Sequence, residues 1–237
     1  MALQAKIPAL LASPDSDASP DISPDLSLDA GLDASLGDLR FRALLSSEDW
    51  ESLPLATRRR FSKRLAGGAT TVYAGEVVEV RFSRTGRWLS QLARLIGGPL
   101  PIAADTGVPS IVTVTEDAAT GGQVWTRIYA RRRKFPQVIH SAKRFAGPTG
   151  LEEYLGYGVG MALRIAVEGQ ALQFRSVGYF LQLGRLKLRL PAFLSPGALT
   201  VTHTDLGCGE FCFTLEIVHP RFGMLVRQSA VFRETTS

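Results

Sequence analysis

Apolar and polar residues alternate with a period of two along most of the chain from Ala69 onward. Successive side chains of a β-strand point to opposite faces of a sheet, so this pattern predicts strands. Turn signals such as Gly121-Gly122, Gly147-Pro148 and Ser195-Pro196-Gly197 separate them. The pattern predicts eleven strands, at residues 71–82, 110–116, 123–131, 135–143, 151–156, 160–167, 172–183, 185–190, 199–205, 210–219 and 224–233.

Short connections between these strands predict hairpins, which join antiparallel neighbours and exclude a parallel βαβ fold. About ten strands suffice for a sheet to close or curl on itself. We therefore predict a mainly β domain, an antiparallel meander that forms a barrel or a deep half-barrel, and we favour closure. Its interior would be lined by alternating apolar faces: Met161/Leu163/Ile165/Val167, Leu186/Leu188/Leu190 and Phe211/Phe213/Leu215/Ile217. Side chains would fill this interior, or it would hold one apolar ligand; the pattern leaves both open.

Residues 38–68 carry helical signals and form a predicted lead-in to the sheet. Asp38 is a candidate N-cap of a first short helix. A second helix starts near Ser47, and Pro54 suits the first turn of a third, which we expect to reach Leu65. These short N-terminal helices should lie across one end of the sheet.

Residues 84–97 predict one inserted amphipathic helix between the first two strands. At 100° per residue its side chains divide into two arcs. The apolar arc holds Trp88, Leu89, Leu92, Leu95 and Ile96, and the polar arc holds Arg84, Arg87, Ser90, Gln91 and Arg94. Such a helix usually caps a barrel or packs on a sheet, and we favour that position. Its flanking basic residues also suit a helix that dips into anionic lipid.

Composition changes near residue 37. Residues 1–37 hold six Asp, one Lys and three Ser-Pro-Asp tripeptides, with few apolar residues, which predicts a disordered acidic tail. Residues 38–237 then form a single β-rich domain. The chain carries a formal charge of +5 and the tail −5, so the domain carries +10. This balance favours anionic partners, although solubilising residues on exposed strand faces would give the same charge.

Cysteine content and hydropathy limit the location of the protein. Cys208 and Cys212 are too few for a disulfide framework, and in one extended strand they would lie about 13 Å apart, too far to bond. This favours a reducing compartment. No apolar run approaches the length needed to span a bilayer. We expect a soluble cytoplasmic protein, with peripheral contact to a membrane as an alternative.

The sequence contains no segment that fits a known cofactor-binding or metal-binding motif. Gly156-x-Gly158-x-Gly160 lacks the Rossmann spacing and precedes a strand instead of a helix. His203, Cys208, Cys212 and His219 invite a zinc site. However, a turn at Gly207-Cys208 would pair His203 with Cys212 and leave His219 about 23 Å away along the strand and on the other face. We therefore expect no metal site and no cofactor.

The sequence contains no known motif for nucleophilic catalysis either. The sequence contains no Gly-x-Ser-x-Gly elbow and no His-Glu-x-x-His. A triad that assembles only in space stays open, because its order in sequence is not fixed. We expect no catalytic residue, and a binding domain in preference to an enzyme.

Candidate ligand-binding residues come from three places. Trp125, Arg127 and Tyr129 share one strand face; such a stripe can bind bases or phosphates, but we favour a cation–π ladder on an outer surface. His219, beside Pro220 at a strand end, is either a satisfied rim residue or a polar group at a pocket mouth. Together with the inserted helix, the candidates are Trp88, Leu92, Trp125, Arg127, Tyr129 and His219.

Several motifs occur in an order that resembles a known family. They are Leu53-Pro54 before an Arg-rich helix, the helix Trp88 to Ile96 ending at Gly97-Gly98-Pro99-Leu100-Pro101, the strand Val124-Trp125-Thr126-Arg127, and the run from Phe211 to Val226 with His219-Pro220. From about Leu39 to Glu234, the chain resembles a bacterial domain of unknown function, the 4166 family. The resemblance implies companions like saccharopine dehydrogenase or NAD-dependent epimerase, fused or neighbouring. In that family the helix after Leu-Pro often ends in His, where this chain has Phe61.

Three binding functions follow from these observations. The preferred one is a non-catalytic β-barrel-like module for an apolar or lipid-like ligand, with the Trp88 helix as a lid or membrane-touching element. The first alternative is an accessory subunit of a separate NAD-dependent oxidoreductase. The second is a binder of anionic surfaces or nucleic acid, of which nucleic acid is the less favoured.

Overall fold

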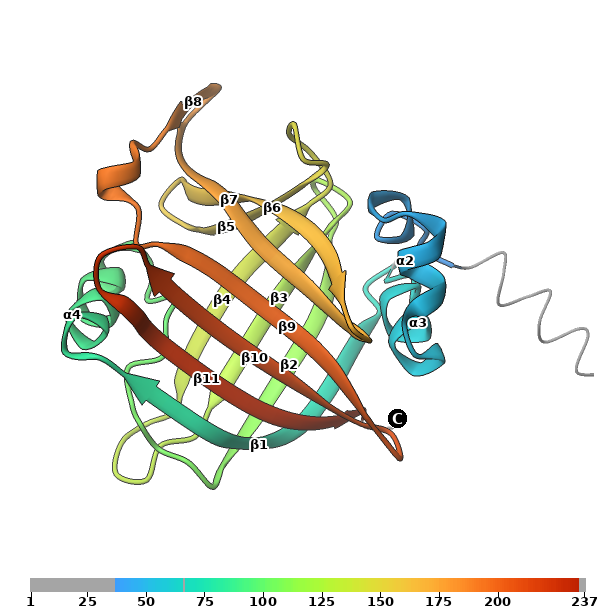
Figure 1. Cartoon of the computed structure of the whole chain (residues 1–237), viewed down its shortest axis with the longest axis horizontal. Helices are drawn as coiled ribbons and strands as arrows, with labels where there is room; N and C mark the ends of the chain where they lie inside the picture. The colour runs from blue at the N-terminus through green and yellow to red at the C-terminus, as the bar shows by residue number, and fades with distance from the viewer. Residues whose placement is uncertain (1–36, 66, 235–237) are drawn as a thin grey trace, which may run out of the picture. The chain divides into compact units, whose positions relative to one another are not determined.

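The computed structural model describes residues 37–65 and 67–234 (Figure 1). The chain divides into two units, Met1–Ser35 and Leu36–Ser237, and the described residues belong to the second. The predicted acidic tail therefore lies outside the described residues, except for Gly37.

Ten antiparallel strands close into a barrel (Figure 1). Around the barrel β1 to β7 follow one another, β7 pairs with β9, and β9, β10 and β11 lead back to β1. All eleven predicted strands are confirmed within two residues at each end. Their bounds are β1 (Thr70–Phe82), β2 (Val108–Asp117), β3 (Gly122–Tyr129), β4 (Gln137–Arg144), β5 (Leu151–Gly156), β6 (Val159–Glu168), β7 (Ala171–Leu183), β8 (Leu186–Arg189), β9 (Ala198–Gly207), β10 (Glu210–His219) and β11 (Gly223–Glu234).

The strand β8 stands outside the closed barrel. It forms a hairpin with the last residues of β7, whereas β9 pairs only with Leu172 to Arg175 near the start of β7. All four residues of β8 are exposed. The predicted inward face is therefore wrong for Leu186 and Leu188, and only Leu190, after the strand, packs partly against the core. The alternation of apolar and basic residues in β8 thus belongs to a hairpin strand whose two faces are both exposed to solvent.

Apolar side chains fill most of the barrel interior, as two of the predicted faces indicate. Met161, Leu163 and Ile165 are buried, as are Phe211 and Ile217. Aromatic rings pack edge to face among them, which is the arrangement that their quadrupoles favour. These buried side chains form the core of the barrel.

The N-terminal helices cover one end of the barrel (Figure 1): η1 (Arg42–Leu44), α2 (Ser47–Ser52) and α3 (Leu55–Phe61). The Ser46 hydroxyl caps α2 by accepting a hydrogen bond from the Asp49 amide. The predicted cap at Asp38 is wrong, because its carboxylate binds Arg40 instead. The helix α3 ends at Phe61, short of Leu65, since the chain then forms an isolated bridge between Lys63 and Gly37.

The inserted helix is confirmed as α4 (Arg84–Leu92), followed by the 3-10 turn η2 (Ala93–Ile96) and ended by Gly97 at φ 97°. Its orientation differs from the prediction. The buried positions are Gly86, Ser90 and Ala93, whereas Trp88, Leu92 and Leu95 are exposed. The helix lies so close to β11 that a Cβ on Gly86 would overlap the backbone of Leu225. Only small side chains fit this contact, so they face β11, and of the large apolar side chains of α4 Leu89 packs partly against the core.

Antiparallel connections alternate between the two ends of a barrel. The end near α2 and α3 is named the α3 end. The opposite end, named the α4 end, carries the 3-10 helix η3 (Ala192–Leu194) and the connections 83–107, 130–136, 157–158, 184–197 and 220–222. No helix among the described residues is long and apolar enough to cross a membrane.

Candidate functional site

A charged cluster lies inside the barrel. Every second residue of β3 points inward, which brings Arg127 beside Glu153 of β5 and Lys143 of β4. The Glu153 Oε1 accepts hydrogen bonds from Lys143 Nζ at 3.1 Å and Arg127 Nη2 at 3.4 Å. Arg127 Nη1 also donates to the Ser141 hydroxyl at 3.2 Å, and Lys143 Nζ lies 4.6 Å from the centre of the Trp125 ring. Two cations thus share one carboxylate.

Burial and charge act on this cluster in opposite directions. Burial raises the pKa of Glu153, but the charges of Lys143 and Arg127, with hydrogen bonds from Ser141 and Lys143, outweigh it and lower that pKa to about 2. Burial lowers the pKa of Lys143; Glu153 raises it, and Arg127 lowers it further, so the net shift is downward. Glu153 is therefore firmly ionised.

A cavity of about 60 Å³ adjoins the cluster. Its wall includes Arg127, Tyr129 and Lys143, with Pro99 and Pro101 from the segment after α4. This space suits a few water molecules, whereas pockets for drug-sized ligands span about 300–1,000 Å³. The interior of the barrel is thus largely filled by side chains.

A second polar contact closes the interior at the α3 end. Arg60 of α3 stacks its guanidinium 3.8 Å from the centre of the Phe211 ring, and its Nη1 lies 2.9 Å from His203 Nε2. His203 is fully buried on β9. Burial and, after it, the charge of Arg60 lower the pKa of His203 to about 3. The imidazole is neutral, and its Nε2 accepts the bond from Arg60, so this contact holds α3 on the barrel.

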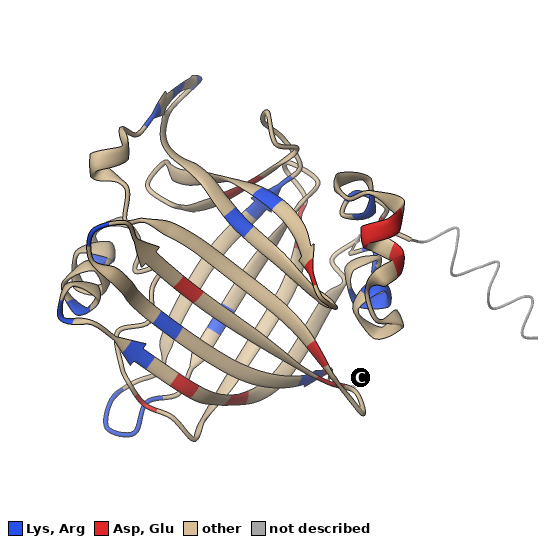
Figure 2. Cartoon of the chain, in the orientation of Figure 1, with Lys and Arg blue, Asp and Glu red and all other residues tan. Residues whose placement is uncertain are grey.

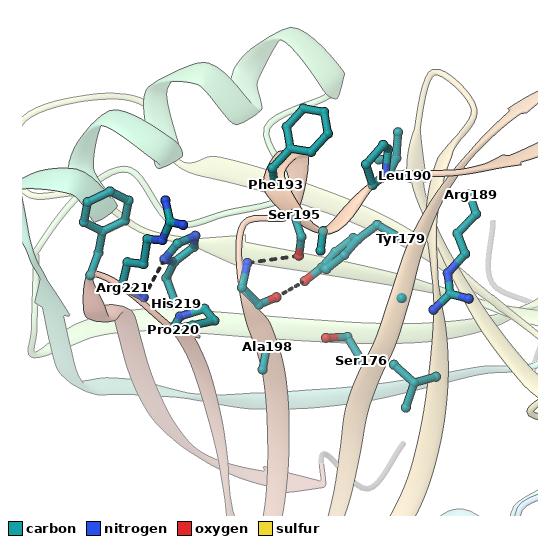
Figure 3. A pocket seen from close by; sticks show the side chains of 16 residues that line it. Ser176, Tyr179, Arg189, Leu190, Phe193, Ser195, Ala198, His219, Pro220 and Arg221 are labelled. Carbon is teal, nitrogen blue, oxygen red and sulfur yellow. Dashed lines mark hydrogen bonds between the residues drawn. The ribbon is translucent and has the colours of Figure 1, made fainter.

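A groove of about 890 Å³ with a mixed lining lies at the α4 end (Figure 3). It lies between the end of β7, the segment after β8 and the turn that joins β10 to β11. Tyr179 is buried at its base and donates a hydrogen bond to the Gly197 carbonyl at 3.1 Å. His219 Nδ1 accepts a hydrogen bond from the Arg221 amide at 3.1 Å.

Apolar side chains and cations make up most of the groove wall. Leu190, Phe193 and Phe222 supply large apolar surfaces. Arg189 and Arg221 lie on opposite sides (Figure 3), and the lining contains no Asp or Glu. Backbone carbonyls and the Tyr179 hydroxyl add a few fixed polar groups. This arrangement can hold an apolar chain and pair with one negative charge; it brings no nucleophile and general base together.

The six candidate residues occupy three separate places. Trp125, Arg127 and Tyr129 line the interior cavity, so the favoured outer-surface interpretation is wrong. Their stripe faces inward because the charge of Arg127 is matched by Glu153. His219 lines the groove, and Trp88 and Leu92 are exposed on α4.

Sequence reasoning missed Lys143, Glu153 and Tyr179. Lys143 had a usable signal, because it alternates with Ile139 and Ser141 on a strand face that the period-two pattern predicts to be uniform. Glu153 had none, since its burial depends on two strands that reach it only in the folded barrel. Tyr179 follows a register shift between β6 and β7, which reverses the face that simple alternation predicts.

The residues of the considered zinc site are dispersed. Cys208 and Gly209 form the two-residue turn, with φ of 51° and 78°, so the turn lies one residue later than predicted. The ladder also shifts by one residue between Glu210 and Phe211, so that His203 pairs with Phe213, not Cys212. Positive φ at both turn positions matches the twist of a tight hairpin, which explains the position of the turn. Among the described residues no three His, Cys, Asp or Glu side chains are arranged to hold a metal ion.

Comparisons with known proteins address the family but not the activity. Neither the curated proteins nor the solved structures include a match to this chain. Residues 53–232 match the model of a family described as a domain of unknown function, DUF4166. That match runs from just before α3 to two residues before the end of β11, and the description assigns no reaction, ligand or partner. The chain therefore belongs to the DUF4166 family of domains of unknown function.

Proposed function

We propose that this domain is a non-catalytic β-barrel binding module for a lipid-like ligand with one apolar chain and an anionic head. The observation that carries the proposal is the groove of about 890 Å³ at the α4 end, with its apolar and cationic lining. Its volume falls within the range of about 300–1,000 Å³ for small-molecule sites. The barrel interior, with its cavity of about 60 Å³, serves as the scaffold.

The groove chemistry selects this ligand class. An apolar chain would bury its surface against Leu190, Phe193 and Phe222, at about 25 cal/mol per Å² removed from water. A carboxylate or phosphate would pair with Arg189 or Arg221, and no acidic side chain in the wall opposes it. Both arginines are exposed, so they contribute orientation more than affinity.

The test measures ligand binding directly. Native mass spectrometry of protein purified without detergent, with organic extraction, should reveal an apolar species at near-unit stoichiometry. A fluorescent long-chain fatty acid should then bind saturably. Ala198→Trp fills the groove and should weaken binding by at least about tenfold, equivalent to 1.4 kcal/mol. Val138→Trp, at an exposed position on β4 outside the groove, is the matched control.

Two results would overturn the proposal. One is a clean unliganded mass together with no saturable binding of the fatty acid. The other is binding that Ala198→Trp and Val138→Trp weaken equally, because the ligand would then lie elsewhere.

A further inference from the structure

Exposed aromatic side chains gather at the α4 end of the barrel. The described residues contain five exposed Phe, Trp or Tyr side chains, and all five lie in the connections of this end: Trp88, Phe135, Tyr157, Phe193 and Phe222. They come from five different connections, and their exposed fractions reach 73% for Trp88, 82% for Phe193 and 92% for Phe135. Large aromatic groups left in water on one end of a domain mark an interaction surface.

Positive charge gathers at the same end. The five connections of the α4 end hold eleven Lys and Arg and a single acidic residue, Asp105. The helices and linkers of the α3 end, at residues 37–65 and 67–69, hold seven basic and four acidic residues. Figure 2 shows the basic loop between β3 and β4 and the basic residues of α4 on one side of the barrel, and the acidic residues of α2 on the other. Charge and aromatic surface therefore coincide.

The helix α4 shows how the two features combine. Its small residues face β11, which leaves Trp88, Leu92 and Leu95 on an exposed stripe at positions i, i+4 and i+7. Arg84, Arg87 and Arg94 are exposed around this stripe. Leu89 packs partly against the core, whereas the stripe of Trp88, Leu92 and Leu95 points away from its own domain and is open to an external partner.

We propose that the α4 end docks on the surface of an anionic lipid bilayer. Trp88, Leu92, Phe135 and Phe193 would enter the boundary between headgroups and acyl chains, the depth at which aromatic rings and amphipathic helices reside. The surrounding Arg and Lys side chains would pair with lipid phosphates, and each would strengthen binding about fivefold near an anionic leaflet.

A bilayer fits this surface better than nucleic acid does. Phosphates of either partner would satisfy the cations, and bases could stack on aromatic rings. Only a bilayer also offers an apolar layer for Leu92, Leu95 and Leu194, which are at least 60% exposed. The groove opens at the same end, so a docked domain would present it to the membrane. Docking itself does not depend on a ligand in the groove.

The tryptophans provide a local reporter. Trp50 and Trp125 are buried, so a change of emission on docking would come from Trp88. The full chain should sediment with vesicles of phosphatidylcholine and phosphatidylglycerol at 7:3 and not with phosphatidylcholine alone. Its emission should shift to the blue, and brominated lipids should quench it. Trp88→Phe should keep the binding and lose the shift.

Variants separate the apolar and the charged contributions. Arg84→Gln, Arg87→Gln and Arg94→Gln together should weaken partitioning about a hundredfold, from about fivefold for each charge. Trp88→Ser with Leu92→Ser should weaken it at least tenfold. All five positions are exposed, so the fold should persist. The matched control at the α3 end is Leu55→Ser with Arg59→Gln, both exposed, which should bind like the wild type.

Four outcomes would overturn the docking proposal. They are no binding to anionic vesicles, equal binding to neutral vesicles, equal loss in the α3-end control, and salt-dependent binding of DNA in place of vesicles. The Ala198→Trp variant distinguishes this proposal from the ligand proposal, because it should still dock on vesicles while it loses the fatty acid.

Discussion

Acidification should destabilise the barrel through His203 before most carboxylates are protonated. The imidazole is buried between Phe61 and Phe211, and Arg60 lies at 2.9 Å from Nε2. A protonated His203 would place a second positive charge beside Arg60, and none of these contacts supplies a carboxylate to pair with it. Lowering the pH therefore favours the unfolded chain, in which the imidazole is solvated and free to take up a proton.

The magnitude follows from the two pKa values. Burial and Arg60 lower the pKa of His203 from 6.5 to about 3 in the folded protein. The unfolded chain binds the proton more tightly, so this stabilisation is complete above pH 6.5 and is lost as the pH falls toward 3. Between pH 7.5 and pH 5 the linkage equation gives a loss of about 2 kcal/mol from this one group.

Urea unfolding at pH 7.5, 6 and 5 measures this effect. His203→Gln keeps an acceptor oxygen for Arg60 but does not titrate, so its free energy of unfolding should lose about 2 kcal/mol less than that of the wild type over this range. His140→Gln, at an exposed position on β4, is the matched control and should follow the wild type. A His203→Gln protein with the full wild-type pH slope would refute the assignment of a neutral buried imidazole.

Two further substitutions test the interior cluster and the seat of α4. Glu153→Gln leaves Arg127 and Lys143 without their shared carboxylate and should lower the free energy of unfolding by about 3–5 kcal/mol. Adding Lys143→Met should restore most of this loss. Urea unfolding measures both effects, and a loss under about 1 kcal/mol for Glu153→Gln would contradict the ion cluster. Gly86→Val forces a side chain into the backbone of Leu225. It should cost at least about 1–3 kcal/mol and expose α4 to proteolysis, and an unchanged unfolding midpoint with unchanged digestion would contradict this contact.

Local periodicity accounts for the success of the strand predictions. Alternation over a few residues reflects the pleat of a single strand, and Gly-containing turns restrict the backbone over two or three residues. Both signals are complete within a short window of sequence. The inserted helix between β1 and β2 was predictable for the same reason, because its period of 3.6 and its terminal Gly97 are local features.

These local signals do not show which face of a strand or helix points into the barrel. Alternation shows that Trp125, Arg127 and Tyr129 share a face, but the inward direction depends on Glu153, which lies on another strand and supplies the balancing charge. The helical wheel of α4 shows an apolar arc, but the contact with Leu225 admits only small side chains and leaves Trp88, Leu92 and Leu95 of that arc in solvent.

The sequence by itself determined the number, order and boundaries of the strands, the antiparallel hairpins and the basic character of the domain. Only the tertiary structure decided that β6 and β7 pair to close the barrel while β8 stays outside, and that five distant connections meet at one end. The physical reason is that strand formation is encoded by neighbours in the chain. Closure, burial of charge and the gathering of aromatic side chains depend on residues that become neighbours only when the sheet curls.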